Sequence, residues 1–421
     1  MKIQRTQFCE ISSWIGKGKI LILRGPRQVG KTTLMKQLQD SLKNKKTVFI
    51  TMDSQKIIES IKTSQDLYYF LEYEHNYHPG EELYLFLDEF QVIPNAGLFL
   101  KNIFDEDNNI HCICSGSSSL EITKTSEFLT GRKIVFDIKP FSFNEFLSVK
   151  KFKPYKTQFS LEEKTFIDIQ KFFQIYSQDL HHFMQEYLLT GGYPEVVLRP
   201  KNEKALIQKD IVNTYIEKDI TQFLQVENTQ AFNNLIILLA SQIGSMVNKS
   251  ELSTTIGISI NTINKYLKIL EGTFVLEFVT PFFTNKRKEL TKMPKVFFTD
   301  TGLRNFLLYG HAHSLDISEI GSLVENFVYN ELRHKSPYKL QFYHTVSRSE
   351  IDFIFSLNIK KIIPIEVKYR NKVTLPVAMK NFIQNYKDNV VSPIIITKDI
   401  CKYENGTYFI PASILSFIEL K

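Results

Sequence analysis

One short glycine-containing stretch constrains the fold of this chain more than any other feature. Residues 25–32 read Gly-Pro-Arg-Gln-Val-Gly-Lys-Thr, which fits the pattern G-x-x-x-x-G-K-[ST]. The apolar run Lys19–Arg24 comes directly before it, and the helix-compatible run Thr32–Leu42 follows. A strand, this loop and a helix in that order direct backbone N–H groups and a helix N-terminus toward phosphate oxygens. The stretch therefore predicts a phosphate-binding loop in a parallel α/β sheet.

The residues of this loop have separate expected roles. Lys31 bridges the β and γ phosphates of ATP in this interpretation, and the Thr32 hydroxyl reaches Mg²⁺. A chance glycine-rich turn is the alternative, but it does not explain the order of the flanking elements. The expected nucleotide contacts are Gly25, Pro26, Arg27, Gln28, Val29, Gly30, Lys31, Thr32 and Thr33.

A pair of acidic residues supplies the second half of such a site. The apolar run Leu83–Leu87 ends in Asp88 and Glu89. We expect Asp88 to order the Mg²⁺ shell and Glu89 to polarise the attacking water. Two acids after a buried strand can also be a plain surface loop, but the preceding phosphate loop favours the functional interpretation. The retained glutamate predicts hydrolysis of ATP as well as binding.

Two further polar residues are candidates at the nucleotide. Ser115-Gly116-Ser117 ends a predicted strand, where a polar side chain such as that of Ser117 can sense the γ phosphate; the alternative is an ordinary strand-to-helix turn. Arg132 lies just before the next predicted strand and can supply positive charge to the transition state, in its own chain or from a neighbour in an oligomer. The alternative for Arg132 is a solvated surface arginine.

Apolar runs separated by helical stretches divide the chain into an α/β part and a more varied remainder. Five runs predict parallel strands in a P-loop domain over residues 1–140: Lys19–Arg24, Thr47–Met52, Leu83–Leu87, Ile110–Cys114 and Lys133–Ile138. Residues 141–230 predict a helical connector or lid. Residues 231–312 have the order helix, short turn, helix and hairpin, which is typical of a winged helix-turn-helix. Residues 313–421 predict a final domain of helices and strands.

The motifs along nearly the whole chain are together similar to those of the prokaryotic AAA-type ATPases with a DUF4143 C-terminal region. The resemblance implies an α/β multidomain protein with an ASCE-type P-loop core, a winged helix and a C-terminal restriction-endonuclease-like domain. The motifs are GPRQVGKTTL, LDEFQ, CSGSSSL, LTGRKIVFDIKPFSFNEF, LLTGGYPEVV, YIEKDI (215–220), FTDTGLR and GSLVENFVYNEL.

The last domain also resembles a PD-(D/E)xK nuclease core. Asp352 is followed after thirteen residues by Glu366-Val367-Lys368, and Glu325 lies on the predicted helix before them. The resemblance implies that Asp352 and Glu366 bind Mg²⁺ or Mn²⁺, that Glu325 is a further metal ligand or supports the ligands, and that Lys368 places or deprotonates the attacking water. Ser-Glu-Ile-Asp stands where the family has Pro-Asp. The alternatives are a solvated salt-bridge strand and a module that binds without cutting.

The net charge and the distribution of basic residues indicate which partners the chain can bind. Lys and Arg number 52 and Asp and Glu 45, so 52 − 45 gives a net charge of +7, which permits a DNA partner without requiring one. For the basic residues near the nuclease-like motif, the alternative is an ordinary solvated sheet edge. For those of the winged helix, contact with a protein partner is an equally weighted alternative. The candidate contacts near the nuclease-like motif are Arg348, Lys360, Lys361, Lys368, Arg370 and Lys372; those in the winged helix are Asn261, Thr262, Asn264, Lys265, Lys268, Lys286, Arg287 and Lys288.

Composition excludes several other classes of protein. The hydrophobic share of 43% and the charged share of 23% are those of an ordinary globular protein. Four scattered cysteines without a CxxC pair argue against a disulfide framework and a structural zinc site. No run approaches the ~20 apolar residues of a membrane helix. We therefore expect a cytoplasmic protein: an ATPase coupled to DNA binding or processing, or alternatively an ATP-gated switch acting on a protein partner.

Overall fold

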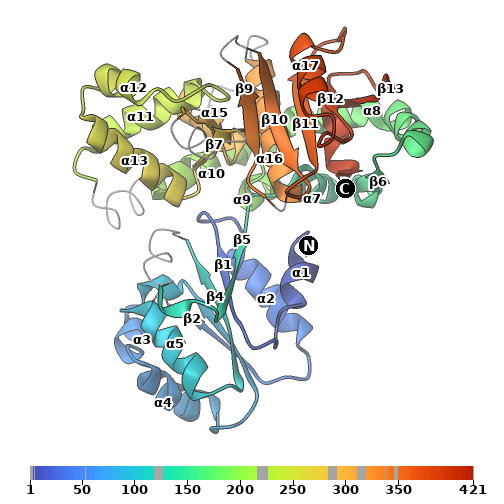
Figure 1. Ribbon diagram of the computed structural model, residues 1–421. Helices are drawn as coiled ribbons and strands as arrows, with labels where there is room; N and C mark the ends of the chain where they lie inside the picture. The colour runs from blue at the N-terminus through green and yellow to red at the C-terminus, as the bar shows by residue number, and fades with distance from the viewer. Residues whose placement is uncertain are drawn as a thin grey trace. The chain divides into compact units, whose positions relative to one another are not determined.

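The computed structural model describes residues 3, 5–52, 54–117, 127–215, 226–282, 292–310, 319–336, 338–345 and 349–420. The chain forms two compact units (Figure 1). The N-terminal unit contains Met1–Lys139 and Lys268–Val275, and the C-terminal unit contains Pro140–Leu267 and Leu276–Lys421.

The N-terminal unit is built on a five-stranded sheet in the order β2-β3-β4-β1-β5. Every strand pair in it is parallel, as the near-continuous apolar runs predict. The strands are β1 Ile20–Arg24, β2 Thr47–Thr51, β3 Leu83–Asp88, β4 Ile110–Gly116 and β5 Lys133–Asp137. The helices are α1 Phe8–Ser12, α2 Lys31–Ser41, α3 Gln55–Ser60, α4 Ser64–His75 and α5 Ala96–Glu106, with 3₁₀ turns at Phe90–Val92 and Glu127–Leu129.

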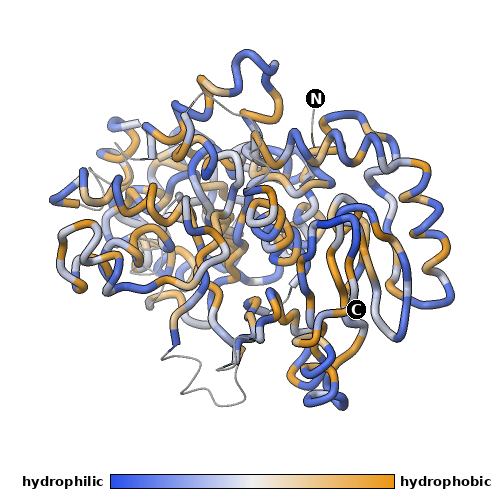
Figure 2. Tube along the Cα trace, turned by 90° about the horizontal axis from the view of Figure 1, so that it is seen from above, coloured by the Kyte–Doolittle hydropathy of each residue, from blue (hydrophilic) through white to orange (hydrophobic). Residues whose placement is uncertain are grey.

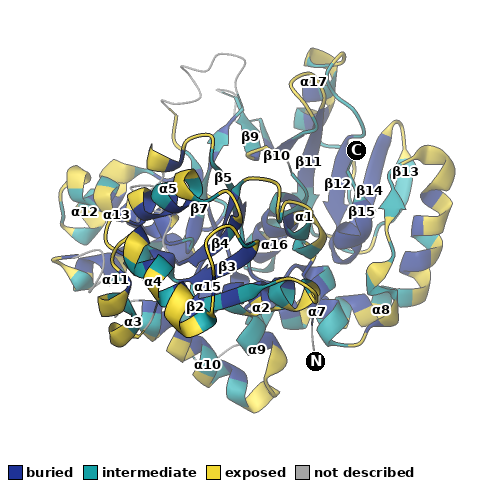
Figure 3. Cartoon of the chain, turned by 90° about the horizontal axis from the view of Figure 1, so that it is seen from below, coloured by how far each residue is buried: buried dark blue, intermediate teal, exposed yellow. Residues whose placement is uncertain are grey.

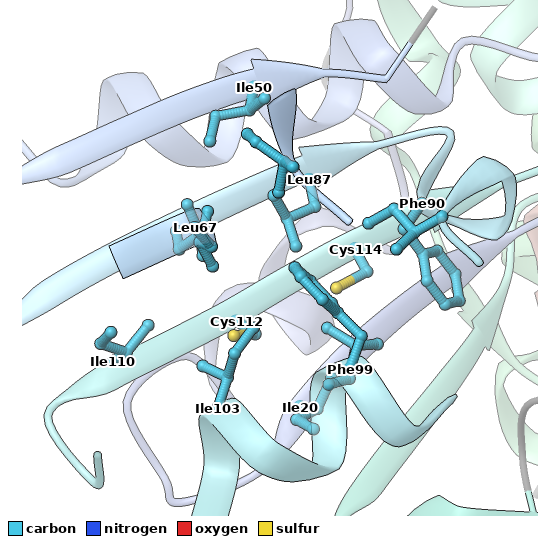
Figure 4. Packing of buried hydrophobic residues seen from close by; sticks show 14 of the residues in the cluster. Ile20, Ile50, Leu67, Leu87, Phe90, Phe99, Ile103, Ile110, Cys112 and Cys114 are labelled. Carbon is cyan, nitrogen blue, oxygen red and sulfur yellow. The ribbon is translucent and has the colours of Figure 1, made fainter. Parts of the chain in front are cut away.

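Alternate residues of each strand pack into two separate cores, one on each face of this sheet. Ile20 and Cys112 pack with Phe99 and Ile103 of α5, as the close-up in Figure 4 shows. On the other face, Leu21, Leu23 and Phe86 pack with Leu34, Met35 and Leu38 of α2. Because side chains alternate between faces in a strand, apolar residues at every position are required to fill both cores. The sheet is therefore fixed from both sides, and its strand ends are held in place.

The C-terminal unit contains an eight-stranded mixed sheet in the order β13-β14-β12-β11-β10-β9-β7-β8. Strands β10, β11, β12 and β14 are largely buried (Figure 3). The strands are β7 Leu276–Pro281, β8 Lys295–Phe298, β9 Gln341–His344, β10 Glu350–Ser356, β11 Ile362–Lys368, β12 Ile394–Thr397, β13 Lys402–Glu404 and β14 Thr407–Pro411. A separate two-stranded sheet pairs β6 Phe159–Ser160 with β15 Ile418–Glu419.

Ten α-helices of the described chain belong to this part of the sequence, and none of the described helices is long and apolar enough to cross a membrane. Hydrophobic and hydrophilic segments alternate at short intervals along the chain (Figure 2). The helices are α7 Phe143–Val149, α8 Phe166–Thr190, α9 Pro194–Leu198, α10 Lys201–Thr214, α11 Thr229–Ser241, α12 Lys249–Ile256, α13 Ile260–Gly272, α15 Thr301–Tyr309, α16 Ile320–Lys335 and α17 Val377–Asn385.

The four domains expected from the sequence differ from the two compact units of the structure. The structure separates the chain after Lys139. Residues 141–230 and 313–421 and most of 231–312 contribute to one compact unit, whereas Lys268–Val275 belong to the N-terminal unit. The hairpin of β7 and β8, expected to be the wing of a separate domain, continues the last sheet, because β7 pairs in parallel with β9 through Thr280 and Gln341. This pairing joins segments that are distant in the sequence, and local sequence patterns do not reveal it.

A buried aspartate joins two of the motifs in the C-terminal unit. Asp300 caps α15 by accepting a hydrogen bond from the Leu303 N–H at 2.8 Å, and it accepts a second from the Gly192 N–H at 2.6 Å. Burial raises the pKa of this carboxyl group to about 6, although the backbone donors oppose that shift. A Cβ atom on Gly302 would lie 2.1 Å from the Thr190 carbonyl oxygen. The end of α8 and the start of α15 are therefore in close backbone contact.

We predict that Gly302→Ala destabilises the protein by about 1–3 kcal/mol, because the new methyl group overlaps the Thr190 carbonyl and the backbone must move. Chemical unfolding of the purified variant measures this change. Gly321→Ala is the matched control, since both glycines are the second residue of a helix and a Cβ atom at Gly321 meets nothing within 4 Å. Equal losses in the two variants would contradict the role of the close contact.

Candidate functional site

The predicted phosphate loop joins β1 to α2 and requires glycine at two of its positions. A Cβ atom on Gly25 would lie 2.1 Å from the Ile138 carbonyl oxygen, so no larger residue fits there without a backbone shift. Gly30 has φ 92° at the N-cap of α2, in the left-handed region that favours glycine. These two positions let the loop turn tightly from the end of β1 into the first turn of α2.

The Lys31 side chain folds back into the loop. It is 5% exposed, and its Nζ donates hydrogen bonds to the Gly25 and Pro26 carbonyl oxygens at 3.0 and 2.9 Å. The N-terminal segment supports the same loop, because the buried Arg5 guanidinium donates to the Val29 carbonyl oxygen at 3.0 Å. Arg5 also contacts the Lys139 carbonyl oxygen, at the end of this unit. The cationic side chains of Lys31, inside the loop, and of Arg5, from the N-terminal segment, therefore both donate hydrogen bonds to carbonyl oxygens of the loop.

Asp88 connects the loop to the neighbouring strand ends. Its carboxylate is 2% exposed and accepts a hydrogen bond from the Thr32 hydroxyl at 2.6 Å. The Ser115 hydroxyl, at the end of β4, donates to the other oxygen of the same carboxylate. Strand β4 lies between β1 and β3, so three adjacent strand ends meet here. A hydroxyl and a carboxylate oxygen at this distance are hard oxygen ligands that fit Mg²⁺.

Glu89 is held beside Asp88 in a conformation that non-glycine residues seldom adopt. Its φ of 55° lies in the left-handed region, which costs about 1–2 kcal/mol. Its carboxylate accepts hydrogen bonds from the Gln91 amide at 2.5 Å and the Ser117 hydroxyl at 3.2 Å. Its backbone N–H donates to the Ser115 hydroxyl at 3.4 Å. These contacts fix the direction of the glutamate side chain.

In the C-terminal unit, the predicted nuclease-like residues come together on two adjacent strands. Asp352 of β10 lies opposite Glu366 of β11, where the Asp352 N–H donates to Glu366 Oε2 at 3.3 Å. The Val367 N–H donates to Asp352 Oδ2 at 2.8 Å, and Lys368 Nζ lies 2.5 Å from Glu366 Oε1. Burial, with the nearby Asp352 charge, raises the pKa of Glu366 to about 7.

A lysine that the sequence analysis did not select lies inside this acidic cluster. Lys295 Nζ is 3.0 Å from Glu325 Oε1 and 3.5 Å from Asp352 Oδ1, and it also contacts Glu350. Lys295 is only 3% exposed. Burial, followed by the Asp352 charge, raises the pKa of Glu325 to about 8, against the opposing effect of Lys295. We refer to Lys295, Glu325, Glu350, Asp352, Glu366 and Lys368 as the acidic cluster.

Comparison with known proteins agrees with both parts of this description. Residues 17–147 match the family model described as an AAA domain, and residues 320–415 match a domain of unknown function, DUF4143. Separate segments of the chain thus match an AAA domain and DUF4143. The predicted resemblance is thereby confirmed. Between these domains, residues 182–314 match another domain of unknown function, DUF8612, which spans the predicted boundary at residue 230.

Relatives of this chain occur in bacteria and archaea. An uncharacterized protein of Haemophilus influenzae is 26% identical over 80% of this chain and 79% of its own length. An uncharacterized protein of Methanocaldococcus jannaschii is 25% identical over 94% of this chain and 84% of its own length. A solved Walker-type ATPase of Pyrococcus abyssi is 12% identical with a TM-score of 0.48, covering 73% of this chain and 96% of that one.

In the AAA domain, the structure brings most predicted residues together and separates one. Lys31, Thr32, Asp88, Glu89 and Ser117 lie at the carboxyl ends of the strands. Gln91 was not predicted. Ser115 belongs to the Ser-Gly-Ser segment that was predicted beside the γ phosphate, but its hydrogen bond to Asp88 was not. The residues of the loop not mentioned so far, Arg27, Gln28 and Thr33, also lie at this end of the sheet, since they connect β1 to α2.

Arg132 is the predicted residue that the structure places elsewhere. Its guanidinium pairs with Asp105, with Nε 2.8 Å and Nη2 3.1 Å from the two carboxylate oxygens. Arg132 precedes β5, and Ile20, the first residue of β1, bonds to its carbonyl oxygen. The phosphate loop follows the last residue of β1, a strand length of ~16 Å away. The expectation that Arg132 serves the nucleotide site of its own chain is therefore corrected.

The DUF4143 domain also departs from the expected metal site. Within the described parts of the chain, no group of three or more His, Cys, Asp or Glu side chains is arranged to hold a metal ion. The expected ligands Glu325, Asp352 and Glu366 do not fit Mg²⁺ or Mn²⁺ here, because the Lys295 ammonium and backbone N–H groups already contact their oxygens. The sequence offers one signal for Lys295: it is a single charged residue at the start of the apolar run that follows Pro294.

The predicted basic contacts are spread over several places. Arg370 and Lys368 line a pocket of about 340 Å³ with Glu325, Asp352 and Tyr369. Lys360 and Lys361 lie in the turn between β10 and β11, at the opposite end of β11 from Lys368. On α13, Asn261, Lys265 and Lys268 are exposed, as is Lys372 after β11, whereas Thr262 and Asn264 are partly buried. Residues 216–220 of the YIEKDI motif and the predicted contacts Lys286, Arg287, Lys288 and Arg348 lie outside the described residues.

We predict that Arg132→Ala leaves ATP turnover within about twofold of the unmodified protein, because an exposed ion pair such as that with Asp105 contributes only ~0–1 kcal/mol. Steady-state phosphate release measures this effect. A loss of turnover beyond tenfold would contradict the prediction, and recovery on mixing with a Lys31→Ala chain would then identify Arg132 as a residue supplied by a neighbour.

Proposed function

We propose that the AAA domain hydrolyses ATP to ADP and phosphate with Mg²⁺, using Lys31, Thr32, Asp88 and Glu89. The observation that carries this proposal is the 2.6 Å hydrogen bond between the Thr32 hydroxyl and Asp88, because it joins the phosphate loop to the acidic strand end. The match of residues 17–147 to an AAA domain supports ATPase activity. Glycine-specific geometry at Gly25 and Gly30 supports a loop shaped for phosphate.

The residues of the site account for each requirement of phosphoryl transfer. Loop N–H groups and the N-terminus of α2 bind the phosphates of ATP, and the Lys31 ammonium exchanges loop carbonyl oxygens for β and γ phosphate oxygens. Thr32 and Asp88 would hold Mg²⁺, which would neutralise charge that develops on the phosphates. Glu89 accepts a hydrogen bond from the attacking water and orients it, while Gln91 and Ser117 keep its carboxylate in position.

We predict that Glu89→Gln binds ATP but hydrolyses it about 10²–10⁴-fold more slowly, because the amide is a poorer acceptor for a water proton than the carboxylate. Fluorescent nucleotide titration measures binding, and phosphate release measures turnover. A Glu89→Gln protein with undiminished turnover would exclude the proposed role of Glu89.

Two control variants separate binding from chemistry. Lys31→Ala should lose ATP binding itself, since the ammonium charge that faces the phosphates is removed. Glu74→Gln changes the same side chain on an exposed part of α4 and should leave both binding and turnover unchanged.

We propose further that ATP turnover is coupled to DNA. Exposed Asn261, Lys265 and Lys268 on the second helix of the helix-turn-helix can contact phosphates and base edges. Arg370 and Lys368 add positive charge beside the pocket of the DUF4143 domain. The net charge of +7 is compatible with such binding. The second candidate is an ATP-gated switch that binds a protein partner through a non-cleaving DUF4143 domain, and the Lys295 ammonium within the acidic cluster favours it over metal-dependent cleavage.

We predict that DNA raises the steady-state ATP turnover of the purified chain, and that the effect falls steeply as salt rises because phosphate contacts release counterions. Phosphate release with single-stranded, duplex and branched DNA at two salt concentrations measures it. Lys265→Ala with Lys268→Ala should weaken the stimulation while basal turnover persists. Turnover that no DNA changes would instead support the protein-binding switch.

A further inference from the structure

The acidic cluster contains a cation of its own, supplied by the protein. Lys295 Nζ lies 3.0 Å from Glu325 Oε1 and 3.5 Å from Asp352 Oδ1, and it contacts the Glu350 carboxylate. These carboxylates come from α16 and from β10. We infer that Lys295 takes the place of a divalent metal ion in the acidic cluster, so that the DUF4143 site assembles without metal and does not use metal to cut a phosphodiester.

The backbone around Lys295 fixes the position of its ammonium group. Lys295 is the first residue of β8 and pairs with Val279 of β7, and it also forms a bridge with Met246. Its Nζ lies 5.5 Å from the centre of the Phe342 ring, and the residue is 3% exposed. A lysine on a flexible surface loop could leave a site to admit a metal ion. This lysine starts a buried strand, and its ammonium is surrounded by the Phe342 ring and the carboxylates that it contacts.

The oxygen atoms that a metal ion would need already have partners. Asp352 Oδ1 faces Lys295, and Asp352 Oδ2 accepts from the Val367 N–H. Glu366 Oε1 faces Lys368, and Glu366 Oε2 accepts from the Asp352 N–H. Glu325 Oε1 faces Lys295.

Glu350 Oε1 also contacts Lys295. Mg²⁺ demands oxygens at 2.0–2.1 Å in near-octahedral geometry. A metal ion bound to these six oxygens would therefore have to displace their present contacts, next to the Lys295 ammonium.

Removal of this ammonium should turn the acidic cluster into a metal site. Lys295→Ala leaves Glu325, Glu350 and Asp352 facing a space without their cation, and three carboxylates are a suitable oxygen set for a divalent ion. We therefore expect Lys295→Ala to gain one Mn²⁺ site per chain that the unmodified cluster lacks. Glu325→Gln added to Lys295→Ala should lose that site again.

The measurement is Mn²⁺ binding to the full chain without nucleotide, followed by the loss of the free-ion electron paramagnetic resonance signal. All proteins carry Asp88→Ala, which removes the Mg²⁺ residue of the AAA domain, so the outcome does not depend on ATP hydrolysis. The Asp88→Ala chain should bind no Mn²⁺ at the cluster. The inference is overturned if the Asp88→Ala chain, with Lys295 unchanged, binds Mn²⁺ at a site that Glu366→Ala or Glu325→Gln abolishes.

Two further proteins guard against a variant that does not fold. Lys295→Met keeps most of the side-chain volume without the charge and should gain Mn²⁺ binding like Lys295→Ala. Lys204→Ala is the matched control, because Lys204 is also buried and pairs with the single carboxylate of Glu186 at 2.7 Å. It should gain no site. Folded Lys295 variants that bind no Mn²⁺, or equal gains in the Lys204 control, would overturn the inference.

Discussion

The hydrogen bonds to the Asp88 carboxylate connect the parts of the AAA domain on which its chemistry depends. Thr32 reaches Asp88 from the loop after β1, and Ser115 reaches it from the end of β4. Parallel strands bring their carboxyl ends to the same edge of the sheet, so the strand order alone delivers all three residues to one place. The two packed faces then hold that edge rigid, because every strand of the sheet is pinned by helices on both sides.

Local sequence patterns were sufficient to predict the parallel strands of the N-terminal unit and the residues Lys31, Thr32, Asp88 and Glu89. The phosphate loop and the Asp88–Glu89 pair are contiguous with apolar strands, so their positions follow from short-range rules. Lys295 could not be assigned in this way, because its three carboxylates come from α16 and β10, which reach it only through sheet pairing. The continuity of β7 with β9 was hidden for the same reason.

The position of Arg132, in contrast, could have been predicted correctly from the sequence. It precedes an apolar run, and the residue before a parallel strand lies at the amino edge of the sheet. The phosphate loop follows a strand and lies at the carboxyl edge. The position of Arg132 along the chain suggested that it lies near the phosphate loop, whereas the direction of the strands excludes this. The ion pair with Asp105 gives Arg132 a local structural partner at its own edge.

The nucleotide site and the acidic cluster both pair their charged groups within the protein, but they differ in which partners can be exchanged. Lys31 bonds to carbonyl oxygens of its own loop, and phosphate oxygens can replace these without breaking a strand. Lys295 belongs to β8, and its removal from the cluster would leave Glu325, Glu350 and Asp352 without their shared cation. A buried charge that loses its partner costs several kcal/mol, whereas an exchange of one hydrogen-bond acceptor for another costs little. The same kind of contact therefore permits ligand binding in the AAA domain and opposes metal binding in the DUF4143 domain.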